Sequence, residues 1–394
     1  MIKKFINGDE AVAEGVRLVK INVVSAYPIT PQTIAVEKIS EFVEDGSLKA
    51  EYMHVESEHS ALACAIGASS VGARAFTATS SQGLLYMAEC LPYASGARLP
   101  IVMMNANRSI ATPWNIYGDQ MDSMFLLNSG WIQVYVEDAQ EALDMIIQAY
   151  KIAENPNVMI PMMVNLDGFI ITHTYELVNI PEQEKVNQFL PKLKMENNKM
   201  DISHPRSLCI TAGNNHNMEF KVKQEIDMHK STKVIEQVDN DFGDMFGRYY
   251  GGMIQEYFCE DADFVLITLG SVSGTAKKVV DDMRTEGYKV GIIKIRYLRP
   301  FPSDRIIASL RNVKKAGVID RNISFGYEGT VFTNVNSAIA NSNLNVKTIN
   351  FIGGIGGRDI TKKNIREAFE ELINSAEFTA ANSVKYMNLR CDYE

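Results

Sequence analysis

The sequence predicts an α/β protein with two domains, each built around a doubly wound, mainly parallel sheet. The chain has 394 residues, which is enough for two or three domains that each bury a core. Short runs of β-branched and other apolar residues alternate along it with helical patterns. The runs are apolar on both faces, as expected of parallel strands that helices cover on both sides.

The first alternation occupies residues 1–175. Its predicted strands are 21–28, 73–80, 99–106, 131–138 and 158–165. Its predicted helices include 10–20, 33–46 and 139–155, and 54–69 reads as a buried helix that begins at an acidic residue. This order of elements indicates a complete α/β unit in the first half of the chain.

The alternation fades between 176 and 240, where we expect a connecting arm that is partly helical. A second alternation follows, with strands at 263–271, 289–298, 315–320 and 346–354 and helices at 275–287, 303–310 and 362–376. We therefore predict a first domain over 1–240, which includes the arm, and a second, smaller α/β domain over 241–394.

Charge and composition exclude several classes of protein. The chain has 39 basic and 48 acidic residues, a net charge of -9, and no basic cluster that would neutralise a phosphate backbone, so we expect no nucleic-acid partner. Its start lacks the apolar core of a secretory signal, and no apolar run reaches the roughly 18 residues of a membrane span. We expect a soluble, cytoplasmic protein.

Cysteine and histidine spacing predicts no metal site in this chain. The five cysteines, at 64, 90, 209, 259 and 391, are far apart and form no zinc or iron–sulfur pattern. The six histidines form no pair of ligands at i, i+4. If the protein does redox chemistry, its metal clusters belong to another chain.

The turn after the first predicted strand is one candidate site. Thr30 stands where a helix N-cap belongs, and Pro31 would take the first helical position. A well-built helix start explains both residues. The turn also lies at the carboxyl edge of a parallel strand, where open α/β sheets bind ligands, and its hydroxyl and backbone N–H groups suit a carboxylate or carbonyl oxygen.

Glu58 is a second candidate. An acid in the first turn of a helix often only complements the helix dipole. Small residues then recur at helical spacing and would let another backbone or a flat ring come close; they are Ala61, Ala65, Ala68 and Gly72. Glu56 is a competing carboxylate, and spacing does not rank the two.

Arg108 follows an apolar strand directly, again at the sheet edge. An isolated arginine is often a solvated surface group, but its planar fork is a good clamp for a carboxylate, and its position favours the clamp. The turn TSSQGLL, residues 79–85, is either a third ligand-facing loop or an ordinary connection. The segments GSVSGTA and GGIGGRD fit neither G-x-G-x-x-G nor a phosphate-binding loop, so nucleotide chemistry has no support.

Several long blocks resemble one enzyme family. In order they are AYPITPQT, ESEHSALACAIGASSVGARAFTATSSQGL, NANRSIATPWNIYGDQMDS, NLDGFIITHT, IRYLRPFP and IDRNISFGYEGTVF. They resemble the α subunit of the 2-oxoacid:ferredoxin oxidoreductases, most closely that of the pyruvate enzymes. The resemblance covers nearly the whole chain and weakens only near 180–205 and after about 375.

The resemblance implies a fold and a reaction. The first domain would be the pyrimidine-side thiamine diphosphate domain, and the second a transketolase C-terminal-like domain. The enzymes of this family oxidise pyruvate to acetyl-CoA and CO2 with thiamine diphosphate and coenzyme A, and they reduce ferredoxin through [4Fe-4S] clusters. Many also run in reverse as pyruvate synthase.

The resemblance also implies roles for three residues. Glu58 aligns with the glutamate that hydrogen-bonds N1′ of the cofactor's aminopyrimidine ring. Arg108 aligns with the arginine that holds the substrate carboxylate, and Thr30 with the threonine that hydrogen-bonds the substrate near its reacting carbons. In this interpretation a ring fills the space beside Glu58, which is why the helix tolerates the charge.

One family motif is missing and implies partner chains. Thiamine enzymes bind the diphosphate through Mg²⁺ on a GDG…N motif, and neither EDGSLK nor LDGFI fits it. The Mg²⁺, the diphosphate site and the proximal cluster would then lie on a β subunit, with γ and δ subunits also expected, and this chain alone would be inactive.

Three alternatives stay open at this point. The same chemistry could act on a branched-chain 2-oxoacid, 2-oxoglutarate, indolepyruvate or oxalate. A non-catalytic assembly subunit could keep the fold, but it would be expected to lose the aligned Glu, Arg or Thr. A nucleotide-binding module is the third alternative.

Overall fold

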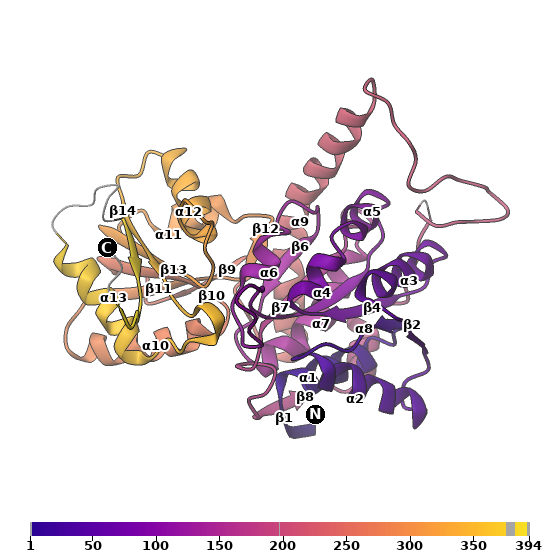
Figure 1. Cartoon of the computed structure of the whole chain (residues 1–394), viewed down its shortest axis with the longest axis horizontal. Helices are drawn as coiled ribbons and strands as arrows, with labels where there is room; N and C mark the ends of the chain where they lie inside the picture. Colours follow the sequence, from indigo (N-terminus) through magenta and orange to yellow (C-terminus); the bar gives the residue numbers. More distant parts are fainter. Residues whose placement is uncertain (1, 197, 376–382, 392–394) are drawn as a thin grey trace.

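Two α/β units lie side by side in the chain (Figure 1). The computed structural model describes residues 2–196, 198–375 and 383–391. The first unit has a seven-stranded sheet with the order β12-β6-β7-β5-β4-β2-β3, in which all strands are parallel except β12. The strands are β2 (Val23–Ala26), β3 (Glu51–His54), β4 (Ala75–Thr79), β5 (Val102–Asn107), β6 (Ile132–Tyr135), β7 (Met162–Asp167) and β12 (Tyr297–Arg299).

Helices cover both faces of this sheet. They are α1 (Gly8–Leu18), α2 (Thr33–Glu44), α3 (Glu58–Ser70), α4 (Ser81–Tyr86), α5 (Cys90–Gly96), α6 (Met121–Met124) and α7 (Ala139–Ala153). Alternate residues of a strand point to opposite faces. Phe76 and Met104 therefore pack with α1, α2 and α7, whereas Ala75 and Met103 pack with α3, α4 and α5. The prediction of a parallel sheet covered on both sides is confirmed.

The sequence patterns missed three strands of the first half. β3 is an edge strand whose side chains are mostly exposed, so it carries no apolar run. β1 (Ile2–Ile6) and β8 (Glu176–Ile180) form a separate antiparallel pair. They pair across about 170 residues of sequence, which no local pattern indicates.

The predicted arm is partly helical, as expected. It contains α8 (Gln183–Phe189) and the long helix α9 (Asn217–Phe246). The first turns of α9 project away from the body of the molecule (Figure 1), and its last turns are buried against the first unit. The predicted domain boundary at 240/241 falls inside α9, and the division into 1–240 and 241–394 stays a prediction.

The second unit has a six-stranded sheet with the order β15-β14-β13-β10-β11-β9, in which β9 alone is antiparallel to its neighbour. Its strands are β9 (Ile254–Tyr257), β10 (Phe264–Leu269), β11 (Val290–Ile295), β13 (Lys315–Asp320), β14 (Lys347–Ile352) and β15 (Val384–Tyr386). Its helices are α10 (Val272–Thr285), α11 (Ser303–Ser309), α12 (Thr330–Ala340), the short η1 (Ile355–Gly357) and α13 (Lys362–Asn374). The predicted strands and helices of this half are found, with one correction: the predicted strand 289–298 is two strands, β11 and β12, and β12 belongs to the first sheet. Ala376, at the end of the last predicted helix, lies outside the described residues.

The two units are joined by a strand that crosses from one to the other and by a buried cluster of charges. The chain leaves the second sheet at the end of β11 and joins the first sheet as β12, antiparallel to β6. Lys294 and Arg296 donate to the carboxylate of Glu141 in α7 at 2.6 and 2.8 Å, and all three side chains are buried. These contacts hold the units together. No helix in the described part of the chain is long and apolar enough to span a membrane.

Candidate active site

The predicted site residues gather at one edge of the first sheet. Thr30 follows β2, Glu58 begins the helix after β3, and Arg108 follows β5. The turn 79–85 follows β4. Because β5, β4, β2 and β3 are neighbours in this order, their carboxyl ends form one continuous edge, which is where α/β sheets bind ligands.

The turn at Thr30 is not the helix start that we predicted. α2 begins at Thr33 with Gln32 as its N-cap, so Thr30 is no cap and Pro31 is not the first helical residue. The backbone N–H of Gln32 donates to the carbonyl of Ile29 at 3.0 Å, and its side chain donates to Tyr27 O at 2.8 Å. These bonds make a separate turn before the helix, which leaves Thr30 exposed at the sheet edge.

Arg108 is not a solvated surface group, because only 5% of it is exposed. Its Nη1 donates to the backbone carbonyl of Thr30 at 2.7 Å, and its Nη2 lies 3.4 Å from Oε1 of Gln82. Its Nε is buried without a partner. Burial lowers the pKa of Arg108, against the opposing charges of Asp122 and Glu58. The guanidinium is therefore held in place at Thr30 with donor capacity left over.

The structure ranks the two competing carboxylates. Glu56 is exposed and accepts a hydrogen bond from Ser60 Oγ, whereas Glu58 is 8% exposed. Ser57 is the N-cap of α3, and its hydroxyl accepts from Ser60 N at 3.2 Å. The Glu58 carboxylate makes no side-chain hydrogen bond or ion pair with the described residues. The Glu58 oxygens are not among the enclosed polar atoms that lack a partner, so they face the open space at the sheet edge, where a ligand can donate to them.

The small residues of α3 bring protein, not a ligand, close to the helix. Ala61 and Ala65 are fully buried and pack in one cluster with Leu84, Met87 and Leu91 of the α4–α5 region. Gly72 lies beyond the end of α3. We expected these small residues to admit either another part of the protein backbone or a flat ring. The packing of Ala61 and Ala65 supports the first of these.

The turn 79–85 lies against two of the three predicted site residues, Glu58 and Arg108. Gln82 lies beside Arg108, and a Cβ added to Gly83 would come within 2.6 Å of Glu58 Oε1. Ser81 has a positive φ of 53°, and its hydroxyl donates to Ser109 O at 2.6 Å. The loop therefore faces the same space as Glu58 and Arg108 and is more than a connection.

Asp122 is a site residue that the sequence did not reveal. It is fully buried, and its Oδ2 accepts from the backbone N–H groups of Ser81 at 3.0 Å and Arg108 at 3.1 Å. Its Oδ1 accepts from Asn107 Nδ2 at 2.7 Å. Burial raises the pKa of Asp122 to about 6, although these hydrogen bonds lower it. The only sequence signal was an acidic residue in the otherwise uncharged segment 121–124, which has methionines at both ends. This signal points to a site only when the ends of β4 and β5 are known to be adjacent.

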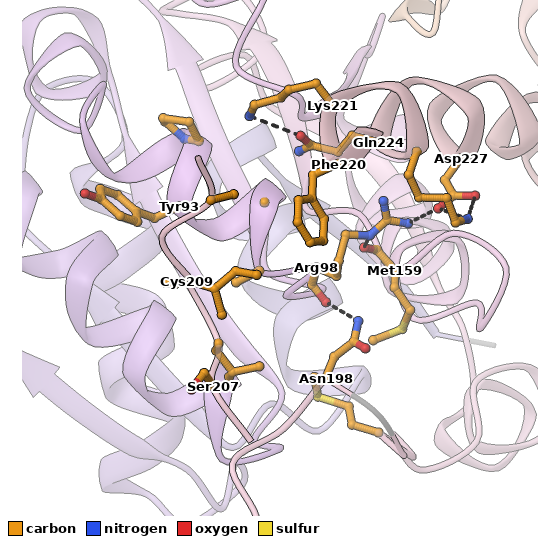
Figure 2. A pocket seen from close by; sticks show the side chains of 18 of the residues that line it. Tyr93, Arg98, Met159, Asn198, Ser207, Cys209, Phe220, Lys221, Gln224 and Asp227 are labelled. Atoms are coloured by element: carbon orange, nitrogen blue, oxygen red, sulfur yellow. Dashed lines mark hydrogen bonds and ion pairs between the residues drawn. The ribbon is translucent and has the colours of Figure 1, made fainter. Parts of the chain in front are cut away.

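A large cavity lies away from this edge. It has a volume of about 760 Å³ and lies between α5, the segment 194–212 and the first turns of α9. Figure 2 shows its lining, in which Arg98 pairs with Asp227 at 2.8 Å and Lys221 with Gln224 at 3.3 Å. These polar groups are satisfied by one another, and none of the predicted site residues lines the cavity, so we do not place the chemistry there.

The described residues contain no group of three or more His, Cys, Asp or Glu side chains arranged to hold a metal ion. The two histidines near Glu58 have other neighbours. The ring of His54 lies 4.8 Å from that of Tyr52, and His59 Nε2 lies 3.5 Å from Cys90 Sγ. The groups at this sheet edge can thus accept a proton or hydrogen bond at Glu58 and bind an anion at Arg108.

Comparisons with known proteins agree along the whole chain. Residues 14–240 match the family described as pyruvate flavodoxin/ferredoxin oxidoreductase, thiamine diphosphate-binding, and residues 262–365 match pyruvate:ferredoxin oxidoreductase core domain II. The chain is 44% identical over 394 residues to a pyruvate synthase subunit PorA of Methanothermobacter thermautotrophicus, with all of both chains covered. It is 46% identical over 389 residues to the PorA of Methanocaldococcus jannaschii, with 98% of both covered.

A second group of relatives is equally similar. The ketoisovalerate oxidoreductase subunit VorA of Pyrococcus horikoshii is 45% identical over 371 residues, with 94% of both chains covered. Two solved structures share the fold at low identity. A 2-oxoglutarate:ferredoxin oxidoreductase from Magnetococcus marinus has a TM-score of 0.73 at 21% identity, over 94% of this chain and 65% of that one. A split-gene transketolase has a TM-score of 0.55 at 13% identity, over 94% and 99%.

These likenesses confirm the predicted architecture of two α/β units of the kind found in thiamine enzymes. The family match covers more than half of the chain, and the relatives match it from end to end at well over 30% identity. The chain belongs to the pyruvate:ferredoxin oxidoreductase family and carries its thiamine diphosphate-binding domain.

Proposed function

We propose that this chain is the α subunit of a pyruvate:ferredoxin oxidoreductase, which oxidatively decarboxylates pyruvate to acetyl-CoA and CO2 and reduces ferredoxin, reversibly. The observation that carries the proposal is the meeting of Glu58, Arg108 and Thr30 at one edge of the thiamine diphosphate-binding domain. The chain holds half of the catalytic centre, and partner subunits supply the rest.

Glu58 would hold the aminopyrimidine ring of thiamine diphosphate. Its side chain is nearly buried, and its carboxylate has no hydrogen-bond donor among the described residues. An ionised carboxylate can only accept hydrogen bonds. A protonated ring nitrogen supplies the missing donor, so the residues present fit this half of the cofactor. When bound, thiamine diphosphate supplies a carbon nucleophile and an electron sink for decarboxylation.

Arg108 and Thr30 would bind the 2-oxoacid. Arg108 is already fixed by its 2.7 Å hydrogen bond to Thr30 O, so little side-chain freedom is lost when its free N–H groups meet a carboxylate. The Thr30 hydroxyl is exposed next to this contact and can donate to the substrate near its reacting carbons. Together the two residues orient the substrate and hold its negative charge.

Exposed aromatic side chains around the site support the need for a partner. Tyr86 ends α4, Phe125 follows α6, and Trp114 and Tyr117 lie on the segment after Arg108; their exposed fractions run from 52% to 72%. Large exposed aromatic groups near one site are typical of interfaces. We propose that a β subunit with Mg²⁺ and the diphosphate site covers them, and that γ and δ subunits complete the complex. The [4Fe-4S] clusters would lie on partners, with coenzyme A as co-substrate and ferredoxin as electron acceptor.

A second candidate is the same reaction on ketoisovalerate or another 2-oxoacid. The VorA relative is as similar to this chain as the PorA relatives are, so identity does not separate the two substrates. The carboxylate clamp at Arg108 serves every 2-oxoacid equally. The walls that contact the substrate side chain decide between them.

The test is to purify the protein from its native source without oxygen, identify the subunits that accompany it, and measure CoA-dependent reduction of a viologen dye. We expect iron–sulfur subunits and a higher kcat/KM for pyruvate than for ketoisovalerate, 2-oxoglutarate, indolepyruvate or oxalate. A higher kcat/KM for ketoisovalerate than for pyruvate would show that ketoisovalerate is the substrate. A colourless, inactive protein would identify a non-catalytic subunit and overturn the proposal.

A further inference from the structure

The segment 109–120 connects the two residues that fix the clamp, Arg108 and Asp122. Its base is closed by a hydrogen bond from Ser109 N to Tyr117 O at 3.0 Å. Beyond the segment, Asp122 Oδ2 accepts a hydrogen bond from the backbone N–H of Arg108. A shift of this segment would therefore move the backbone of Arg108 at one end and Asp122, which accepts its N–H, at the other.

The second unit holds this segment at four points. The backbone N–H of Gly356 donates to Asp119 Oδ2 at 2.9 Å, and Asn115 Nδ2 donates to Gly356 O at 2.9 Å. Arg321 Nη2 donates to the carbonyl of Gly118 at 2.8 Å, and the carbonyl of Arg321 accepts from Gln120 N at 2.9 Å. The loop beside the substrate clamp is thus anchored by residues that lie far away in the sequence.

The anchoring turn needs its glycines. Residues 353–357 belong to the GGIGGRD segment, which fits no nucleotide-binding motif. Gly354, Gly356 and Gly357 have φ values of 72°, 61° and 78°, a region that favours glycine. A Cβ on Gly356 would lie 2.6 Å from Asn115 Nδ2, and one on Gly357 would lie 2.3 Å from the Tyr117 Cβ. The glycines allow the turn to approach the segment closely.

Asp119 continues the connection toward the clamp. It is fully buried, and its second oxygen, Oδ1, accepts from Met121 N at 3.1 Å, where α6 begins. Asp122 lies one residue further along α6. The order of contacts from the second unit to the clamp is therefore Gly356, Asp119, the start of α6, Asp122 and the backbone of Arg108.

We propose that the glycine turn 353–357 of the second unit is a positioning element for substrate binding, which holds segment 109–120 so that Arg108 and Asp122 keep their arrangement. This inference rests on the proposed function. It gives the second unit a part in 2-oxoacid binding, although the turn itself does not touch the reacting atoms. Gly356 and Asn115 act as positioning residues in this arrangement.

The first test is Gly356→Ala in the assembled complex, with Gly287→Ala as its matched control. Gly287 also has a positive φ, of 92°, but a Cβ there would meet nothing within 4 Å. Both changes carry the same kind of backbone strain, and only Gly356→Ala disturbs the segment. Because misplacement by about 1 Å can cost up to about 10²-fold, we expect the KM for pyruvate to rise roughly 5- to 100-fold with the KM for CoA unchanged.

Asn115→Ala is the second variant, because it removes the contact without straining the turn. We expect a smaller rise in the KM for pyruvate. In the double variant, the methyl group added at position 356 no longer meets the Asn115 side chain. The two effects should therefore combine to less than their product.

Amide hydrogen exchange on the full chain gives a measurement that needs no activity. Gly356→Ala should speed exchange in segment 109–120, and Gly287→Ala should not. If the wild-type complex uses no 2-oxoacid, the proposed function fails, while exchange still reports on the anchoring. If the wild type is active and Gly356→Ala matches Gly287→Ala in either the KM for pyruvate or the exchange of 109–120, the positioning role is overturned.

Discussion

Two of the places where the chain buries charged groups differ in how their hydrogen bonds are satisfied. Between the units, both oxygens of Glu141 are occupied, by Lys294 Nζ, Arg296 Nε and the backbone N–H of Glu137. At the sheet edge, the Glu58 carboxylate has no donor among the described residues, and the Nε of Arg108 is buried without an acceptor. Burying charge is costly. In the first cluster the carboxylate has its donors within the chain, although Arg296 Nη2 is buried without an acceptor, whereas the Glu58 carboxylate has none among the described residues.

This difference separates a structural cluster from a functional one. A carboxylate whose two oxygens both accept from donors of the same chain, as in Glu141, stabilises the contact between the units and offers no free acceptor to a ligand. Charges with unfilled hydrogen-bonding capacity at a sheet edge are suited to bind one. Residue type alone does not make the distinction, because both clusters contain a glutamate and an arginine.

The largest effect is expected for Glu58→Gln in the assembled complex. The amide is nearly isosteric but cannot accept the charge-assisted hydrogen bond, so kcat should fall by about 10²- to 10⁴-fold, the usual contribution of a proton-transfer group. Steady-state kinetics measures this, and Glu56→Gln is the control because Glu56 is exposed. Equal kinetics for the two variants would contradict the assignment of Glu58.

Glu141→Gln should act on stability instead of chemistry. It removes the shared carboxylate from two buried cations, Lys294 and Arg296, which keep Glu137 at 2.9 Å and Asp239 at 3.3 Å as their anionic partners. The loss should approach the figure of about 3–5 kcal/mol that breaking a buried pair costs in the free energy of unfolding. Denaturant unfolding of the isolated chain measures this loss. Glu286→Gln breaks the exposed pair with Arg366 and should change stability little. A loss no larger than that of the control would show that the cluster does not hold the units together.

Arg108→Ala should weaken pyruvate binding in the complex. Removing one partner of a desolvated charge pair costs about 2–5 kcal/mol, which is roughly 30-fold or more in the KM. Arg108→Lys should recover only part of the loss, because lysine keeps the charge without the planar fork. Unchanged KM and kcat values in the alanine variant would exclude the clamp.

Acidity should affect the two clusters in opposite directions. Burial raises the pKa of Glu141, but Lys294 and Arg296 outweigh it and bring the value to about 2. Its stabilisation is therefore present above its unfolded value of 4.5 and is lost as the pH falls through about 2. Burial raises the pKa of Asp122 to about 6, so its contribution is present below 3.8 and is lost as the pH rises through about 6.

Unfolding midpoints of the isolated chain between about pH 2 and 7 test this pair of directions. Glu141→Gln should flatten the dependence on the acid side, and Asp122→Asn should flatten it between about pH 4 and 6. If the unfolding midpoint depends on pH in the same way in the wild type and in both variants, Glu141 and Asp122 do not cause the dependence.

Thr30→Val should give the smallest effect. It removes a single hydroxyl from an exposed position, and a neutral hydrogen bond contributes about 0.5–1.5 kcal/mol. The kcat/KM for pyruvate should fall by roughly 2- to 12-fold. Cofactor affinity should be unchanged, and Thr30→Ser should restore the rate. Equal rates for the valine and serine variants would leave Thr30 O, which accepts from Arg108, as the only contribution of this residue.

The fold was largely predictable from the sequence because burial imposes local patterns. Strands such as β5 and β10 are buried on both faces and carry runs of apolar residues, and α1 and α7 carry the period of amphipathic helices. The sequence patterns did not predict β3, β1 or β8, because partly exposed edge strands and strands paired over a long sequence distance carry no such pattern. The cap assigned to Thr30 was wrong because hydrogen bonds of Gln32 make a turn before α2.

By itself, the sequence determined the class of fold, the family and the short list of Glu58, Arg108 and Thr30. Only the tertiary structure showed that Glu58 is buried and Glu56 exposed, placed Thr30 O against Arg108, and joined Asp122 and the turn at Gly356 to them. The physical reason is the distance along the sequence over which each signal acts. Hydrophobic periodicity acts between residues a few positions apart, whereas a site at the edge of a parallel sheet is assembled from strand ends that crossovers bring together.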